Sequence, residues 1–524
     1  MSRWCCSALV ALLLGCSGAD EAEQLAPLDT DKDHVPSELR VVLGSEPASL
    51  DPHKTNMAVE SRTLMYLMQG LMELSPEGTV QGGAAEEWQV SDDGLTWRFK
   101  LRPGLQWSDG VSITAEDFVY SFRRALDPIT ASRSAEQLYD IVNAEEIQKG
   151  QLPVTELGVT AEDPIWIRFD LKRPNPYFDS VLVSTIAMPV PRHVVEAHGE
   201  AWVRPENWVS NGTYTLSRRI PGDRLELTSV RPNETYFDNV FFIPIIDPKV
   251  AYNRYRAGEV HAIPDLPRDI DLAEVEGDLR EWTFAAYLLL GFNHTKAPFD
   301  DVNVRRALSL AIDQEFVART IHKPPQIPAY GFVPKFVDPE APNFPPRPEN
   351  WAEEAKRLLA QAGFTESNPL ELVLRYSTRE LKSIPVGIMG AWQQIGVSTT
   401  LEGKEPAIHY SELLTADYDV ALSGRLNPAR SEQFIYEFAE DALNENLSRY
   451  RDPAVSDLWE KLQGEPDKDI REKVSREIQQ ILIDDVVAIP LYFRQGRGLV
   501  RPEIQGWVDN YYNVHPLKNL SWQE

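Results

Sequence analysis

Cysteine is nearly absent from this 524-residue chain, and its three cysteines, Cys5, Cys6 and Cys16, all lie close to the N-terminus. The remainder of the chain therefore has no thiol that could form a disulfide, act as a nucleophile or bind zinc through sulfur. Motifs for other catalytic chemistry are also missing: the chain has no G-x-S-x-G, P-loop, G-x-G-x-x-G or H-E-x-x-H pattern. These absences argue against the common hydrolase, nucleotide-binding and zinc-protease classes.

Basic residues are scarce relative to acidic ones, with 52 lysines and arginines against 80 aspartates and glutamates and a formal net charge of −28. This balance argues against nucleic acid as a partner, because phosphate backbones are bound by basic surfaces. It is typical of a soluble monomer. The length exceeds what one hydrophobic core usually organises, so we expect two or three lobes.

One pair of histidines superficially suggests a metal site. His193 and His198 flank Glu196, but a spacing of five residues places the two rings about 140° apart around a helix. The segment is more typical of a solvated helix face. No pair of carboxylates stands out among the 80 acidic residues as glycosidase machinery. We therefore predict no catalytic residue, no metal and no cofactor.

Long hydrophobic runs are also missing, apart from one near the N-terminus. Arg3 precedes an apolar run over residues 4–14, which is shorter than the about 20 residues that a membrane-spanning helix needs. The run ends in Leu-Leu-Gly-Cys, which resembles a bacterial lipobox and implies a signal peptide over residues 1–15 and lipidation of Cys16. The alternative is an ordinary secretory signal that contains a chance cysteine. Residues 16–37 are small, polar and acidic, which predicts a flexible tether.

Residues 87–128 carry the most informative pattern of the chain. Asp93-Gly94 predicts a turn, residues 96–101 alternate polar and apolar side chains as a half-buried strand does, and Thr114 with Asp117 predicts a helix start. The helix should bury Phe118, Phe122, Ala125 and Leu126 and end before Pro128. The three spaced tryptophans and the Trp-Ser-Asp-Gly segment closely resemble the signature of family 5 extracytoplasmic solute-binding proteins, the receptors of oligopeptide ABC importers.

Other segments resemble the same family, so the likeness covers the chain from about residue 39 to its end. They are the Ser-Leu-Asp-Pro turn at residues 49–52, the Asn-Gly-x-Tyr strand at residues 208–216, and residues 231–238 and 292–308. The apolar patterns predict a strand over residues 39–43, a helix over residues 59–74, and a helix after Asp301. They also predict helices over residues 350–362 and 470–482 and a buried strand over residues 486–493.

The resemblance implies an α/β fold of the periplasmic-binding-protein type II kind, with two lobes that close on the ligand and an extra domain. It implies domain I in three parts, residues 38–68, 191–285 and 489–524. Domain II is then expected at residues 69–190 and domain III, the second closing lobe, at residues 286–488.

The resemblance also implies a ligand site between the lobes, and here the chain departs from the family. The family holds a peptide amine with an aspartate after the strand that ends here at Ser423-Gly424, yet residues 425–431 contain no aspartate. One alternative is that Glu432, the nearest carboxylate, or another acid takes the place of this aspartate; the other is that the ligand is different. Arg425 or Arg430 would favour a negative or neutral ligand group if it faces the site; alternatively both arginines pair with surface acids. The candidate ligand-binding residues are Asn56, Met57, Ala58, Ser423, Gly424, Arg425, Leu426, Asn427, Glu432, Tyr492 and Phe493.

We therefore expect an exported, lipid-anchored monomer in the periplasmic space or cell envelope that delivers oligopeptides to an ABC permease. The membrane is contacted only through the anchor. The alternative is a family 5 receptor for another solute, such as an oligosaccharide, a metal chelate or an opine-like compound. An extracytoplasmic hydrolase is a further alternative from a different class.

Overall fold

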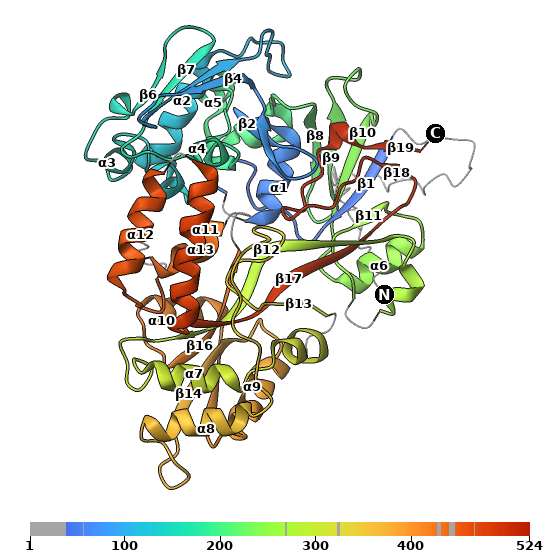
Figure 1. Ribbon diagram of the computed structural model, residues 1–524. Coiled ribbons are helices and arrows are strands. Elements are labelled where there is room, and N and C mark those ends of the chain that lie inside the picture. The colour runs from blue at the N-terminus through green and yellow to red at the C-terminus, as the bar shows by residue number, and fades with distance from the viewer. Residues whose placement is uncertain are drawn as a thin grey trace, which may run out of the picture.

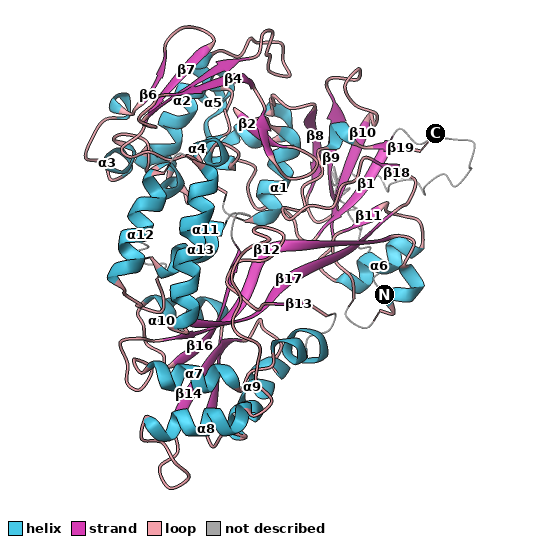
Figure 2. Cartoon of the chain, in the orientation of Figure 1, coloured by secondary structure: helices cyan, strands magenta, loops and turns pink. Residues whose placement is uncertain are grey.

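The computed structural model describes residues 38–55, 57–267, 270–321, 325–426, 431–439, 446–465 and 467–523. Figure 1 shows strands running through the centre of the molecule, helices gathered at its lower end, and both strands and helices at its upper end. Figure 2 shows helices and strands in all parts of the molecule, as expected for the α/β class.

A mixed sheet connects the two ends of the molecule. Its strands, in spatial order, are β15 (Ser398–Lys404), β14 (Glu371–Ser377), β16 (Val420–Leu426), β12 (Leu279–Phe292), β17 (Ala488–Val500), β11 (Ala262–Ile263), β1 (Glu38–Leu43), β10 (Asn239–Pro244), β9 (Arg224–Ser229) and β8 (Tyr214–Ile220). The short strand β13 (Ile327–Pro328) pairs with β17 beside this path.

The long antiparallel strands β12 and β17 cross from one part of the molecule to the other (Figure 1). We call residues 38–267 and 501–523 the first half and residues 293–487 the second half. Leu279 pairs with Leu499 beside the first half, whereas Gly291 pairs with Ala488 beside the second. The register is irregular between Thr283 and Tyr287, where the two strands pass between the halves. We call this stretch the crossover.

The first half contains a second sheet, ordered β4 (Ala85–Val90), β5 (Thr96–Leu101), β7 (Trp166–Asp170) and β6 (Val159–Ala161), and a hairpin of β2 (Met72–Leu74) and β3 (Val80–Gly82). Near the C-terminus, β18 (Ile504–Gln505) pairs with β19 (Ser521–Trp522). The helices of this half are α1 (Ala58–Leu67), α2 (Ala115–Leu126), α3 (Ala144–Gln148), α4 (Phe178–Val181), α5 (Arg192–His198) and α6 (Pro248–Arg256).

The strand, turns and helix predicted over residues 87–128 are confirmed. Gly94, Gly104 and Gly110 have positive φ angles, as turns at these positions require. The Asp117 carboxylate accepts a hydrogen bond of 2.8 Å from the backbone N–H of Thr114 and so closes the start of α2. The apolar face of α2 packs in the core of the first half, where Phe118, Phe122, Ala125 and Leu126 are buried.

The helix predicted over residues 59–74 is wrong in its second part, because α1 ends at Leu67. The side-chain amide of Asn211 takes the place of the next helical hydrogen bonds: it accepts from the Gln69 backbone N–H at 2.9 Å and donates to the Gln69 carbonyl at 2.7 Å. At Gly70 a Cβ would lie only 3.1 Å from the Leu182 carbonyl, so the chain passes close to a neighbouring segment there. Residues 72–74 therefore pair as β2 instead.

Helices cover both faces of the sheet in the second half. They are α7 (Val302–Leu310), α8 (Trp351–Gln361), α9 (Ser383–Gln393), α10 (Pro406–Leu414), α11 (Ser431–Ile435), α12 (Pro453–Gly464) and α13 (Lys468–Asp484). On β12, Leu288 and Leu290 share a core with α7, α8 and α9, whereas Tyr287 and Leu289 share a core with α11, α12 and α13. A strand buried on both faces has a continuous apolar sequence, which explains the sequence of residues 286–290.

The other predicted elements of the second half are confirmed with small shifts. Asp301 caps α7 by accepting a hydrogen bond of 2.8 Å from the Asn303 backbone N–H. Gly363, with a φ of 89°, follows the end of α8. Helix α13 covers the predicted residues 470–482, and the strand predicted over residues 486–493 is the first part of the longer β17.

Candidate ligand-binding site at the crossover of the two halves

The predicted site residues of the first half lie at the start of α1. The Met57 side chain is 52% exposed, and the Met57 backbone N–H donates to Glu60 Oε2 at 3.3 Å, which closes the helix start. Ala58 is the first residue of α1. Asn56 lies outside the described residues. This end of α1 thus offers an exposed thioether beside a helix N-terminus.

The predicted residues of β16 point to opposite faces of the sheet, because side chains alternate along a strand. Ser423 is 4% exposed, and its Oγ has no hydrogen-bond partner among the described residues. It lines a small cavity together with Tyr418, Glu437 and Phe438. Gly424 faces the other side and pairs with Leu288 of β12.

The end of β16 continues the same pairing. Arg425 and Leu426 pair through their backbones with Tyr287 and Ala286 of β12, so both lie at the crossover. Asn427 and Arg430 lie outside the described residues, as does Cys16. The structure therefore places the end of β16, where the chain departs from the family by lacking an aspartate, at the crossover of the two halves.

Tyr492 and Phe493 are core residues of β17. Tyr492 is completely buried among apolar side chains that pack with α7 and α9, and Phe493 is buried on the α13 side. Phe493 packs edge to face on Phe434 with ring centroids 6.3 Å apart. The backbones of Tyr492 and Phe493 pair with β12 and β13, so these two residues lie at the crossover through their backbones and not through their side chains.

Residue Arg494, which sequence reasoning did not single out, stands at the crossover itself. Its Nη2 donates a hydrogen bond of 2.7 Å to Glu380 Oε1, in the turn that follows β14. The guanidinium covers the α-carbon of Gly424, where a Cβ would lie 3.4 Å from Nη2. The available signal was a charged residue immediately after the apolar run of residues 486–493.

Glu432 lies in a contact between the two halves. Glu432 is 7% exposed, and its Oε1 has no hydrogen-bond partner among the described residues. The side chain of Glu432 is hydrogen-bonded to Tyr177 of the first half. The pKa of Tyr177 is raised, mainly because the phenol is buried and secondly because the negative charge of Glu432 lies beside it. A second contact between the halves is the ring pair of Phe336 and Tyr511, with centroids 6.1 Å apart.

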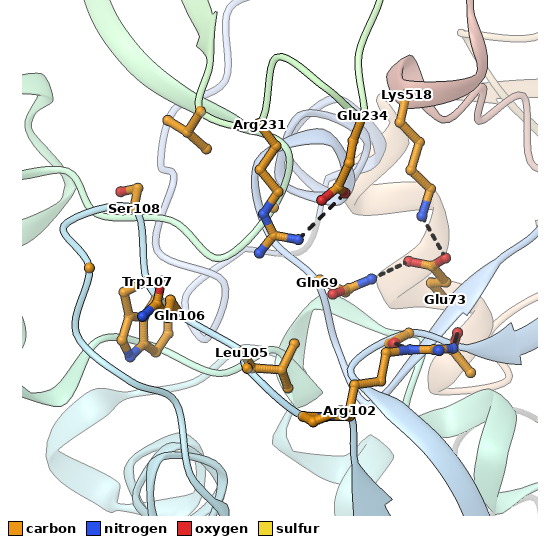
Figure 3. A pocket seen from close by; sticks show the side chains of 17 residues that line it. Gln69, Glu73, Arg102, Leu105, Gln106, Trp107, Ser108, Arg231, Glu234 and Lys518 are labelled. Atoms are coloured by element: carbon orange, nitrogen blue, oxygen red, sulfur yellow. Dashed lines mark hydrogen bonds and ion pairs between the residues drawn. The ribbon is translucent and has the colours of Figure 1, made fainter.

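One pocket lies away from the crossover, within the first half. It has a volume of about 640 Å³ and is lined by the β2–β3 hairpin, residues 102–108 and the loop of residues 230–234. Figure 3 shows that Glu73 accepts hydrogen bonds from Gln69 and Lys518, each at 2.9 Å, and that Arg231 faces Glu234. Arg102, which also lines the pocket, donates to the backbone carbonyls of Gly83 and Gly82. None of the predicted site residues lines this pocket, so the crossover is kept as the candidate ligand site.

In the part of the chain that the structure describes, no three His, Cys, Asp or Glu side chains are grouped so as to hold a metal ion. His193 instead contacts Asp109, with Nε2 and Oδ2 2.7 Å apart. None of the described helices combines the length and the apolar character needed to cross a bilayer.

Comparison with known proteins identifies relatives along most of the chain. The chain is 34% identical to the periplasmic oligopeptide-binding protein OppA of Salmonella typhimurium over 499 residues, which cover 91% of this chain and 90% of that protein. It is 32% identical to the probable deoxycholate-binding periplasmic protein YgiS of Escherichia coli, with 88% and 89% covered.

Solved structures with a similar fold superpose on this one to different degrees. The periplasmic murein tripeptide-binding protein MppA in its unliganded open form gives a TM-score of 0.83 at 28% identity, covering 93% of this chain and 97% of that one. Haemophilus influenzae OppA in complex with the peptide RPPGFSPFR gives 0.74 at 29% identity, with 93% and 99% covered. At nearly equal identity, the unliganded open form therefore superposes better on this structure than the peptide complex does.

The family model itself covers more than half of the chain. The model of the bacterial extracellular solute-binding proteins, family 5, middle part, matches residues 79–444. This range includes the Trp-Ser-Asp-Gly segment, the β12 strand and the β16 strand, so it spans both halves and the crossover. The chain belongs to the bacterial extracellular solute-binding proteins of family 5.

Proposed function

We propose that this protein is the receptor of an ABC importer, which captures oligopeptides outside the cytoplasmic membrane and delivers them to the permease. The observation that carries the proposal is the 34% identity to an oligopeptide-binding protein over 91% of the chain. The fold supports it, because a structure in complex with a nonapeptide shares the fold over 93% of the chain.

We place the ligand between the two halves, at the crossover. Extended peptides commonly bind through their backbones to exposed strand edges, while hydrated pockets accept varied side chains. The candidate contacts remain Met57 and Ala58 from the first half and residues 423–427 from the second. Domain I is proposed at residues 38–68, 191–285 and 489–524, domain II at residues 69–190 and domain III at residues 286–488. Ligand binding would then close domain III on the other two.

We further propose that the protein is exported and held at a membrane by lipid on Cys16, with residues 16–37 as a tether. Acyl chains anchor through burial of methylene groups, each worth ~0.8 kcal/mol. Replacing the thiol in Cys16→Ser removes the attachment atom, so the variant should appear in the soluble fraction and should not incorporate a labelled fatty acid. Labelling of the variant to the level of the unaltered protein would contradict the anchor.

A second candidate is a receptor for a non-peptide solute, favoured by the 32% identity to a relative whose name gives deoxycholate as its ligand. Native mass spectrometry of the freshly purified protein separates the two candidates by the mass of the co-purified ligand. Titration calorimetry with a mixed tetrapeptide library and with deoxycholate then compares the affinities. Binding of deoxycholate without binding of any peptide would contradict the oligopeptide proposal.

We propose no catalytic activity, in keeping with a family of substrate-binding proteins. Incubation of bound peptides with the purified protein should return them intact. Steady-state cleavage that one substitution abolishes would instead support the hydrolase alternative.

A further inference from the structure

Arg494 is a charged side chain at the crossover, beside the strand β16 that ends in residues 425–426. It follows Phe493, which pairs with Tyr287, and precedes Gln495, which pairs with Thr283. The register of β12 and β17 breaks between these two pairs, so Arg494 stands at the position where the sheet passes from one half to the other. Its neighbour across the sheet, Gly424, belongs to the strand that leads into residues 425–431.

The guanidinium is held in place but is not fully used. One atom, Nη2, donates to Glu380 Oε1 at 2.7 Å, and Glu380 is itself only 12% exposed. The Arg494 side chain is 42% exposed, and its other donors have no hydrogen-bond partner among the described residues. Guanidinium carries five N–H donors in a planar fork. Glu380 therefore fixes one corner of the fork while the rest remains open to solvent.

The guanidinium lies close to Gly424 of β16. A Cβ at residue 424 would lie 3.4 Å from Nη2 of Arg494, in van der Waals contact with it. With glycine, the fork lies against the backbone of β16. A ligand strand that runs past the end of β16 would therefore meet the free edge of the fork.

We propose that Arg494, oriented by Glu380, binds a carboxylate group of the ligand. This inference rests on the proposed function, because it concerns the ligand of the same site. The planar guanidinium can donate two parallel hydrogen bonds to a carboxylate, and its positive charge repels an ammonium group. The carboxylate comes either from the C-terminus of a peptide or from an acidic side chain, and the two sources share the same chemistry.

Four tetrapeptides of one neutral sequence separate the two sources by titration calorimetry. They combine a C-terminal acid or amide with glutamate or glutamine at an internal position. The unaltered protein should prefer one acid over its amide by roughly ten- to a hundred-fold, the usual scale for a hydrogen bond to a charged group. The arm in which this preference occurs identifies the source of the carboxylate.

Substitutions at the pair test the residues themselves. R494Q should remove the preference for the acid while leaving the affinity for the amide within a few-fold. E380Q should increase the preference, because glutamine still accepts the hydrogen bond while a competing negative charge is gone. The control is Arg254→Gln, which breaks a comparable pair with Glu259, 2.7 Å, on the distant surface helix α6 and should change nothing.

The outcomes that overturn the inference differ from those that overturn the proposed function. If all four peptides bind equally, or if R494Q keeps the preference, the inference is wrong and the proposed function stands. If no peptide binds but deoxycholate does, the oligopeptide function is wrong; loss of deoxycholate binding in R494Q would then support the inference, and its retention would overturn it. Absence of binding to every probe overturns both.

Discussion

Arg471 Nε donates a hydrogen bond of 2.8 Å to Oη of Tyr177, and its guanidinium lies 4.7 Å from the centre of the tyrosine ring. Tyr177 precedes α4 in the first half and Arg471 belongs to α13 in the second half (Figure 1). Glu432 joins the same contact through its hydrogen bond to Tyr177. A cation, a phenol and a carboxylate therefore connect the two halves in the arrangement of this structure.

Tyr177→Phe should lower the free energy of unfolding by about 1–3 kcal/mol, because it leaves partly buried polar groups without their hydrogen bonds. Urea denaturation measures the change. The control is Tyr139→Phe, which removes a 3.0 Å hydrogen bond to Gln148 inside the first half and should cost about 1 kcal/mol or less. A smaller effect at residue 177 than at residue 139 would show that the contact between the halves adds little stability.

The stability of the protein should fall as the pH falls from 6.5 toward about 4. The pKa values of five histidines are lowered, mainly because their rings are buried. The pKa is about 4 for His53 and His294 and about 3 for His261 and His515. The pKa of His409 is lowered as well. Within this window the unfolded chain binds protons that the folded protein excludes, so acid favours unfolding. Each histidine contributes up to about 1.4 kcal/mol per pH unit.

Two aspartates act in the opposite direction. Burial raises the pKa of Asp265 and Asp509 above 3.8, so the folded protein binds their protons more readily than the unfolded chain does. Five histidines outnumber these two carboxyls, and the net slope should follow the histidines. Urea denaturation at a series of pH values across the window checks this; a free energy of unfolding that stays constant or rises on acidification would contradict it.

Ligand binding should make the molecule more compact. The structure superposes better on an unliganded open form than on a peptide complex, with TM-scores of 0.83 and 0.74 at nearly equal identity. Hinge closure at β12 and β17 would account for that difference. Small-angle X-ray scattering should show a smaller radius of gyration at saturating ligand. An unchanged radius at saturation would argue against closure of the two halves.

Acetylation of the N-terminal amine of a peptide ligand should change the affinity by less than about tenfold, which is below the roughly ten- to hundred-fold scale of one hydrogen bond to a charged group. Residues 425–431 contain no aspartate, and the Glu432 carboxylate is buried against Tyr177. Titration calorimetry with matched free and acetylated peptides measures the difference. A strong requirement for the free amine that disappears in Glu432→Gln would show that Glu432 holds the amine after all.

Local patterns alone predicted much of the fold. The alternation at residues 96–101, the Thr114–Asp117 helix start and the Asp301 cap each depend on neighbours within a few residues, and all are confirmed. The error at residues 68–74 has a long-range cause, since Asn211 lies more than 130 residues away from the chain that it redirects. Periodicity reports which face of an element is buried, but it does not report what is packed against the end of that element.

The sequence by itself also determined the family and the strand where the ligand loop begins, because the motifs of residues 87–128 and 292–308 are contiguous. Only the tertiary structure decided that Ser423 lines a cavity with Leu289, that Glu432 contacts Tyr177, and that Arg494 covers Gly424. These relationships join segments that are distant in the chain. They depend on the register of β12, β16 and β17 across the two halves, and strand register is set by packing on both faces of the sheet.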